Sequence, residues 1–285
     1  MATIAFLGTG LLGSAFAEAA AKRGDDVTAW NRSADKVLAL KPFGVKAADT
    51  PADAVRGATR VHLVLKDDGV VETVLAAARS GLSAGTLVID HTTTLPALTA
   101  QRAARLAAEG VHYLHCPVFM GPPAARSAKG VMMASGPRAL LDAVKADLEK
   151  MTGRLDYMGE RLDLAAANKL FGNAMIIGLA AVMADVLTLA QASDVPASDA
   201  IKLLGLLDLN AMVAGRGMNM ARGDFTASFE LAMARKDVAL MLETTGARPM
   251  AALPAVAARM DALLAAGHGA ADCSVMGVDA VQAQG

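Results

Sequence analysis

Short apolar runs alternate with helical patterns through the first half of the chain. Segments such as LLGSAFAEAAAKRG and DGVVETVLAAARSG place apolar residues at helical spacing between those runs. The runs typical of buried strands are TIAFLG, DVTAW, RVHLVL, GTLVIDHT, VHYLHCPVF and GVMMASG. Apolar strands that alternate with helices predict a parallel sheet covered on both faces.

After Gly159 the pattern is helical throughout. One long apolar helix is predicted from about Asp163 to about Gln191, and three more helices are predicted over ASDAIKLLGLL, FELAMARKDVALMLETTG and LPAVAARMDALLAAG. We expect an α/β Rossmann-type domain over 1–160 and an all-α domain over 161–285, joined by the long helix. Lys169 and Asp185 bracket too short an uncharged run to span a bilayer, so this helix is expected to be buried in a soluble protein.

Length, composition and charge fit this picture. The 285 residues exceed the usual size of one domain, and 54% of them are hydrophobic, which is enough for a large core. The net charge of −1 comes without long charged blocks, which argues against nucleic acid or an anionic membrane as partner. Cys116 and Cys273 lie far apart in the sequence and no signal peptide is apparent, so we expect a reduced, cytoplasmic protein.

A glycine motif lies near the start of the chain. Gly8, Gly10 and Gly13 fit G-x-G-x-x-G, and the motif follows a predicted strand and opens a predicted helix, which is the context that dinucleotide binding requires. The first glycine permits the tight turn, the second leaves room for a pyrophosphate, and the third lets the helix pack on the sheet. The amides of the first helical turn then face the phosphates. A turn that serves packing alone is the alternative.

The second strand ends on Asn31, Arg32 and Ser33 rather than on an acidic residue. An acidic residue there would bind a ribose 2′-hydroxyl, whereas arginine can pair with a 2′-phosphate and stack on adenine. Asn31 and Ser33 can add hydrogen bonds. This end of the strand therefore favours NADP over NAD, with a solvated arginine as the alternative.

Lys169 is the only charged residue between Asp163 and Asp185. Asn173 follows one helical turn later, so the two side chains share a face of the predicted helix. An amine and an amide together could act on a carbonyl or a hydroxyl group. On spacing alone, a lysine that keeps its ammonium in water near a helix end is the better interpretation.

Five segments in chain order together resemble the β-hydroxyacid dehydrogenase family, relatives of 3-hydroxyisobutyrate dehydrogenase and 6-phosphogluconate dehydrogenase. FLGTGLLGSAFA is similar to the family's cofactor motif, and DHTTTLP to its D-x-[ST]-T-x-x-P segment, which contains Asp90, Thr92, Thr93 and Pro96. CPVFMG resembles P-V-S-G-G, NKLFGN resembles K-L-x-x-N, and RKDVALMLE resembles K-D-L-x-L-A, which places Lys236 and Asp237. The resemblance covers nearly the whole chain and implies that Lys169 is the catalytic lysine and Asn173 its partner.

The expected site residues follow from the residues and the resemblance together. The cofactor-binding residues are expected to be Gly8, Gly10, Leu11, Leu12, Gly13, Asn31, Arg32, Ser33, Leu65, Lys66, Thr92 and Lys236. The substrate-binding residues are expected to be Thr92, Thr93, Phe119, Met120 and Gly121.

Two departures from the family pattern bear on the substrate. Phe119 and Met120 stand where the family often has serine and glycine that cradle a substrate carboxylate, and only Gly121 remains. Asp163 and Ala165 stand where glycines usually precede the catalytic lysine. The added bulk predicts a smaller or more apolar substrate, or one without that carboxylate.

The histidines do not predict a metal site. His112 and His115 lie three residues apart on one strand and therefore point to opposite faces. His91 follows the carboxyl end of a strand, where ligands of α/β proteins bind, and it could line the pocket or face water.

We therefore expect an NADP-dependent oxidoreductase that interconverts a small hydroxy compound and its aldehyde or ketone, with Lys169 as general acid and base. An imine reductase of the same architecture and a regulator that binds NADPH without turnover are the alternatives. No metal, nucleic acid or membrane partner is expected, and the alanine- and methionine-rich helical half together with the resemblance predicts a homodimer or homotetramer.

Overall fold

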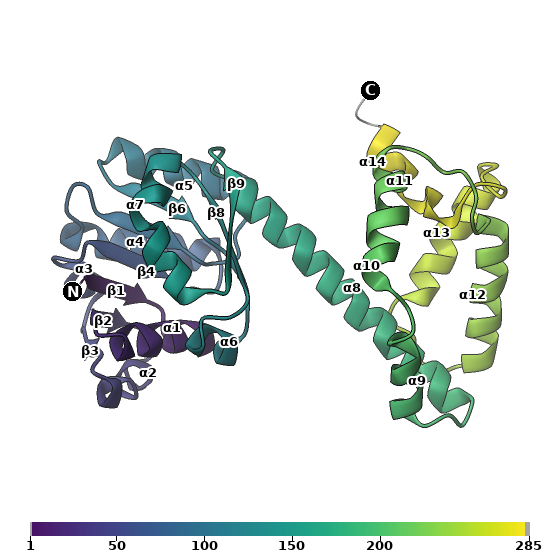
Figure 1. Cartoon of the computed structure of the whole chain (residues 1–285), viewed down its shortest axis with the longest axis horizontal. Helices are drawn as coiled ribbons and strands as arrows, with labels where there is room; N and C mark the ends of the chain where they lie inside the picture. Colours follow the sequence, from purple (N-terminus) through teal and green to yellow (C-terminus); the bar gives the residue numbers. More distant parts are fainter. Residues whose placement is uncertain (1, 283–285) are drawn as a thin grey trace. The chain divides into compact units, whose positions relative to one another are not determined.

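The computed structural model describes residues 2–282 (Figure 1). The chain divides into two compact units, the first ending at Asn173 and the second beginning at Ala174. The boundary lies inside helix α8 (Leu164–Ala192), whereas the sequence suggested a division at residue 160.

The first unit contains a sheet of nine strands within the described residues, in the order β3-β2-β1-β4-β5-β6-β8-β7, with β9 paired to β8. The strands are β1 (Thr3–Leu7), β2 (Asp26–Trp30), β3 (Lys46–Ala47), β4 (Arg60–Leu63), β5 (Leu87–Asp90), β6 (His112–His115), β7 (Val118–Phe119), β8 (Val131–Ser135) and β9 (Arg154–Gly159). From β3 to β6 all neighbours are parallel, in register pairs such as Phe6 with Ala29. This half of the sheet has the strand order of a Rossmann fold, as the sequence predicted.

The expectation of a wholly parallel sheet is wrong beyond β6. Strand β8 pairs antiparallel with β6 and with β7, and β9 runs parallel to β8. The segment between β6 and β8 contains β7 and the five-residue helix α6 (Pro122–Arg126), and the chain turns back after β7 so that β8 runs antiparallel to both strands. The predicted single strand over 111–119 is consequently divided at Cys116 and Pro117 into β6 and β7.

Helices cover both faces of the sheet (Figure 1). They are α1 (Leu11–Lys22), α2 (Ala34–Leu38), α3 (Pro51–Val55), α4 (Asp68–Ala78), α5 (Pro96–Ala108) and α7 (Arg138–Leu148), together with α6. Phe6 and Leu7 are adjacent on β1 and belong to two different buried clusters, one on each face. The predicted burial of the sheet on both faces is therefore confirmed.

The second unit is helical beyond α8. Its helices are α9 (Ala197–Leu204), α10 (Leu209–Met212), α11 (Met218–Ala221), α12 (Leu231–Thr245), α13 (Leu253–Ala265) and α14 (Val278–Gln282). A π-helical turn, Val213–Gly217, joins α10 to α11. The core of the unit includes Leu231, Met260 and Val275.

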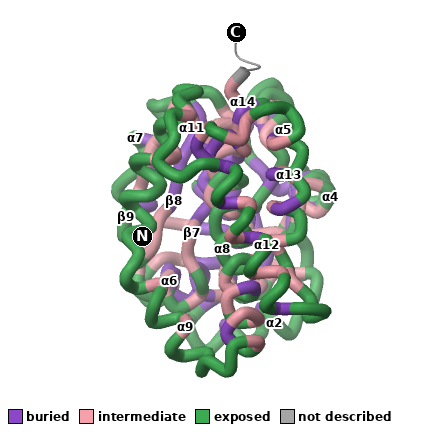
Figure 2. The backbone as a smooth tube through the Cα atoms, turned by 90° about the vertical axis from the view of Figure 1, so that its right-hand side faces the viewer, coloured by how far each residue is buried: buried purple, intermediate pink, exposed green. Residues whose placement is uncertain are grey.

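Helix α8 is not buried within the chain, contrary to the expectation from the sequence. Met175, Ile176 and Ile177 expose more than half of their surface. Figure 2 colours the backbone by burial, with exposed residues in green. Within residues 2–282, α8 is the one helix that is long and apolar enough to cross a membrane by length and composition. The apolar pattern was correctly assigned to a helix, but within residues 2–282 the side chains of Met175, Ile176 and Ile177 stay largely exposed.

Candidate cofactor and substrate site

Glycine is needed at the three motif positions for two different structural reasons. A Cβ atom on Gly8 would lie 2.3 Å from the carbonyl oxygen of Val64, and one on Gly13 would lie 2.1 Å from that of Gly8. Gly8 also has a φ of +100°, which disfavours any side chain. A Cβ on Gly10, in contrast, would meet no protein atom within 4 Å. Gly8 and Gly13 therefore serve the close approach of β1, α1 and β4, while Gly10 faces open space.

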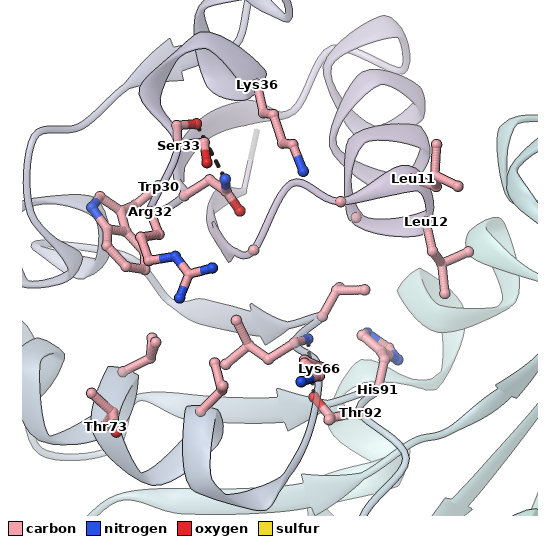
Figure 3. Close-up of a pocket in the computed structure, with 18 of the residues that line it drawn as sticks. Leu11, Leu12, Trp30, Arg32, Ser33, Lys36, Lys66, Thr73, His91 and Thr92 are labelled. Carbon is pink, nitrogen blue, oxygen red and sulfur yellow. Dashed lines mark hydrogen bonds between the residues drawn. The ribbon is translucent and has the colours of Figure 1, made fainter.

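That open space is a cavity of about 710 Å³ at the carboxyl ends of β1, β2, β4 and β5 (Figure 3). It is lined by Gly8, Gly10, Leu11, Leu12, Gly13, Trp30, Asn31, Arg32, Ser33, Lys36, Val64, Leu65, Lys66, Val70, Thr73, Val74, His91, Thr92 and Thr93. Every predicted cofactor residue except Lys236 is among them. Lys236 lies on α12 in the second unit, where its ammonium is 3.0 Å from a carboxylate oxygen of Asp237, and its contact with a cofactor stays a prediction.

One end of the cavity is cationic. Arg32, Ser33 and Lys36 are exposed residues at the end of β2 and on α2, and Figure 3 shows their side chains around the same end of the pocket. Two cations and a hydroxyl are the groups that bind a phosphate monoester. Lys36 was missed from the sequence, although its position four residues after Arg32 and inside a short helix was a usable signal.

Asn31 connects the two loops that form this end. Its Oδ1 accepts a hydrogen bond from the backbone N–H of Thr9 at 3.1 Å, and its Nδ2 donates to the carbonyl oxygen of Ser33 at 3.1 Å. The amide is thus engaged within the protein. Asn31 lines the cavity as expected, but in this geometry it orders the glycine loop and the Arg32 loop rather than offering its amide to a ligand.

The loop after β5 is held from several sides. Asp90 accepts from the backbone N–H of Thr92 at 2.9 Å and from the hydroxyl of Tyr113 at 2.8 Å. The Thr92 hydroxyl accepts from the backbone N–H of Leu65 at 3.1 Å, so it ties the loops after β4 and β5 together. Arg102, whose side chain is fully buried, places Nη1 3.5 Å from Asp90 and Nη2 2.7 Å from Asp68.

His91 lines the cavity and is buried. Its Nε2 lies 2.9 Å from Nδ1 of His62, and its Nδ1 lies 2.7 Å from the carbonyl oxygen of Cys116. Because a carbonyl can only accept, His91 carries its proton on Nδ1 and accepts from His62. Burial lowers the pKa of His91 to about 4, against the raising effect of the Cys116 carbonyl. Both rings are therefore neutral at physiological pH.

Lys169 lies on the first turns of α8, within the first unit. Its Nζ donates a hydrogen bond to the carbonyl oxygen of Val118 at 2.8 Å and lies 4.0 Å from the ring centroid of Phe119. The side chain is half-buried and, within residues 2–282, lies within 4 Å of no carboxylate. Partial burial lowers the pKa of the Lys169 amine, because removal from water disfavours the charged form.

The other predicted substrate residues occupy different surroundings. Thr92 is buried, whereas Thr93 and Gly121 are exposed and Phe119, Met120 and Asn173 are half-buried. Gly121 precedes α6. Phe119 lies on β7 directly beside Val118, whose carbonyl oxygen accepts the hydrogen bond from Lys169. The structure thus brings Lys169 and Phe119 together.

The cavity fits a nicotinamide dinucleotide on its own features. Its volume is in the range of small-molecule sites, Gly10 leaves the approach to the first turn of α1 open, and its far end carries Arg32 and Lys36. Residues 3–159 match the family described as the NAD binding domain of 6-phosphogluconate dehydrogenase. The chain belongs to the β-hydroxyacid dehydrogenase family.

Members of this family and solved structures of the same fold extend the match over most of the chain. The chain is 28% identical over 259 residues to 3-sulfolactaldehyde reductase from Escherichia coli K12, covering 85% of this chain and 83% of that protein. It is 25% identical over 244 residues to glyoxylate/succinic semialdehyde reductase 2 from Arabidopsis thaliana, covering 84% and 68%. An imine reductase from Myxococcus stipitatus in complex with NADP+ superposes with a TM-score of 0.87 at 21% identity, covering 96% and 98%. The protein is thus an NAD(P)-dependent oxidoreductase of this family.

Proposed function

We propose that this protein is an NADP-dependent reductase of small aldehydes or ketones, and that it catalyses the reverse oxidation of the alcohol with Lys169 as general acid and base. The observation that carries the proposal is the placement of Lys169. Its amine is half-buried, has a lowered pKa and lies beside the loop at the end of β7. No carboxylate in residues 2–282 lies within 4 Å of it. The sulfolactaldehyde and semialdehyde reductases among the relatives support a carbonyl substrate.

The preference for NADP rests on the cationic end of the cavity. Arg32 and Lys36 offer charge to a 2′-phosphate, and among residues 2–282 no carboxylate lines the cavity to bind a ribose 2′-hydroxyl instead. Arginine and lysine both form charge-assisted hydrogen bonds with phosphate oxygens. Lys236 is not among the residues that line the cavity, and we propose it as an additional cofactor contact.

The bound cofactor supplies or accepts the hydride. In reduction, the Lys169 ammonium donates a proton to the carbonyl oxygen as the alkoxide forms, which leaves an alcohol and a neutral amine. In oxidation, the neutral amine takes the hydroxyl proton. The carbonyl of Val118 keeps one N–H of the ammonium engaged and so orients the remaining two. Asn173, one turn further along α8, would hold the substrate oxygen, and Thr92, Thr93 and Gly121 the rest of the substrate.

The uncovered helices support a homo-oligomer. Apolar side chains are exposed along α8 and α9, among them Ile177 at 67% and Leu203 at 59% exposed. Contiguous apolar surface of this kind marks an interface, and obligate homodimers have the most apolar ones. Asp185, on the same helix, is buried against the start of α13, which fits a protein partner better than lipid. We propose that a second copy of the chain covers this surface.

The test is a panel of small aldehydes, hydroxy acids and cyclic imines, with NADPH absorbance as the readout and Lys169→Ala as the matched variant. We expect aldehyde-dependent oxidation of NADPH that the substitution abolishes. Turnover of cyclic imines without turnover of any aldehyde would favour an imine reductase. Tight NADPH binding without turnover of any compound would favour a regulator.

A further inference from the structure

The ring of Phe119 packs against the backbone of helix α8 at Gly172. A Cβ atom on Gly172 would lie 2.2 Å from Cζ of the Phe119 ring and 2.8 Å from Cε1. Glycine stabilises a helix less than alanine does, and at Gly172 the structure shows a packing reason for it. The reason here is that only a bare backbone leaves room for the tip of the ring.

The backbone behind the ring is equally confined. A Cβ on Gly130, which has a φ of +91°, would lie 2.9 Å from the carbonyl oxygen of Phe119 and 2.7 Å from Cβ of Met120. Strand β7 pairs with β8 at Phe119 and Val131. The backbone that carries the ring is therefore confined by β8 and Gly130, and the tip of the ring lies against Gly172.

In this position the face of the ring lies against the Lys169 ammonium. The Nζ atom is 4.0 Å from the ring centroid and donates to the carbonyl oxygen of Val118. The face of an aromatic ring carries negative potential, and a carbonyl oxygen does as well. A carboxylate placed against the face of the ring would lose water without gaining a hydrogen-bond donor from the ring or from the Val118 carbonyl, whereas a neutral apolar group would pack on the ring.

We propose that Phe119, seated on Gly172, is a specificity-determining residue that selects neutral carbonyl substrates with an apolar substituent and rejects substrates with a carboxylate beside the ring. This inference rests on the proposed function, because it requires that Lys169 faces the substrate. Phe119 and Gly172 are the pair of residues that sets the substrate class. Gly172 is a positioning residue in this pair, since it acts through the ring.

The first experiment compares butanal with succinic semialdehyde, which have the same four-carbon chain but differ by a carboxylate. In the unmodified protein we expect a higher kcat/KM with NADPH for butanal. Phe119→Ser should shift the ratio of the two values by about tenfold or more toward succinic semialdehyde, the size expected for one altered pocket contact. Phe119→Leu keeps apolar bulk and should keep the preference for butanal.

The second experiment tests the seat without relying on activity. Gly172→Ala should lower the melting temperature, and Gly178→Ala is the matched control, because a Cβ there would meet nothing within 4 Å on the same helix. In a Phe119→Ser background Gly172→Ala should no longer lower the melting temperature, because the ring it collides with is gone. Gly172→Ala should also shift the ratio of the two aldehydes, whereas Gly178→Ala should leave that ratio as it is.

The outcomes are distinguishable. A clear preference of the unmodified protein for succinic semialdehyde, or an unchanged ratio in Phe119→Ser, would overturn this inference and leave the proposed function standing. Turnover of neither aldehyde, nor of any other carbonyl compound in the panel, would overturn the proposed function and the substrate preference with it. Equal melting temperatures for Gly172→Ala and Gly178→Ala would overturn the assignment of Gly172 as the seat of the ring.

Discussion

The Nδ1 atom of His62 lies 2.9 Å from the Nε2 atom of His91, in a buried pair that joins β4 to β5 beneath the cavity. The rings are stacked, with centroids 5.2 Å apart. The outer nitrogen of His91 donates to the carbonyl oxygen of Cys116. The chain of contacts has room for one proton between the two rings, so a second proton cannot be accepted without breaking the pair.

This pair predicts loss of stability in acid. Burial lowers the pKa of His91 to about 4, and burial together with the neighbouring His91 lowers the pKa of His62 well below its usual value. Below about pH 6.5 the two histidines bind protons in the unfolded chain, whereas the buried pair in the folded chain stays neutral. The contribution of the neutral pair to the free energy of unfolding is therefore fully present above that pH and is lost as the pH falls. As pH falls from about 6.5 to 4, His91 alone should cost on the order of 3 kcal/mol of unfolding free energy.

Urea unfolding between pH 8 and 4 measures this effect. The double variant His62→Leu, His91→Met should flatten the curve between pH 6.5 and 4, whereas His112→Gln, which removes an exposed histidine, should not. If the double variant loses as much stability in acid as the parent, the pair is not the source of the sensitivity.

Lys169→Ala should slow hydride transfer. A positioned acid or base contributes a factor of about 10² to 10⁴, so the single-turnover rate should fall by at least the lower value. NADPH affinity should change little, since Lys169 is not among the residues that line the cavity. The pH profile should show a group that is protonated for reduction and deprotonated for oxidation, at a pH below that of an ordinary lysine because burial lowers its pKa. Lys169→Arg should not restore activity, because guanidinium stays protonated. A rate within a few-fold of the parent would make Lys169 a structural residue.

Cofactor preference should depend on two cations. Arg32→Asp should weaken NADPH and favour NADH, because it adds repulsion and a ribose acceptor. Lys36→Ala should weaken NADPH alone. Fluorescence titration with both cofactors measures this, and Lys41→Ala, a lysine that does not line the cavity, serves as the control. Equal affinities for NADPH and NADH in the unmodified protein would contradict the role of Arg32.

Two glycine variants should separate cofactor binding from folding. Gly10→Ala should lower NADPH affinity while the melting temperature changes little, because its Cβ meets no protein atom. Gly13→Ala should destabilise the fold by about 1–3 kcal/mol, because its Cβ would lie 2.1 Å from the carbonyl oxygen of Gly8. Calorimetry and cofactor titration on both variants test the distinction, and equal losses of stability would contradict it.

The chain should be a dimer or a larger oligomer in solution. Light scattering at micromolar concentration should give at least twice the chain mass of 29.1 kDa. Ile177→Glu should shift the protein toward monomer, whereas Leu98→Glu, an exposed apolar position on α5, should not. A monomer in the unmodified protein would leave the exposed face of α8 to another partner, including lipid.

The sequence predicts this molecule well where the signal is local. The glycine motif, strand β1 and helix α1 lie within 20 residues, and each is recognisable from spacing and glycine placement alone. The seat of Phe119 could not be predicted in this way, because Gly172 lies 53 residues later and looks like any helical glycine. The pairing of His62 with His91 likewise depends on strands β4 and β5 being neighbours, and the reversal at β8 depends on its antiparallel pairing with β6 and β7.

Asp185 is synthesised well before the residues that bind it in the folded chain. Its carboxylate accepts hydrogen bonds from the backbone N–H groups of Ala252 at 2.9 Å and Leu253 at 2.8 Å, and these bonds outweigh the effect of burial and lower its pKa. During synthesis at about 5–20 residues per second, these partners emerge roughly 3–13 seconds after Asp185. Throughout that interval the Asp185 carboxylate lacks the backbone N–H donors of Ala252 and Leu253. We therefore expect the nascent chain to be open to chaperones and proteases between the completion of α8 and the start of α13.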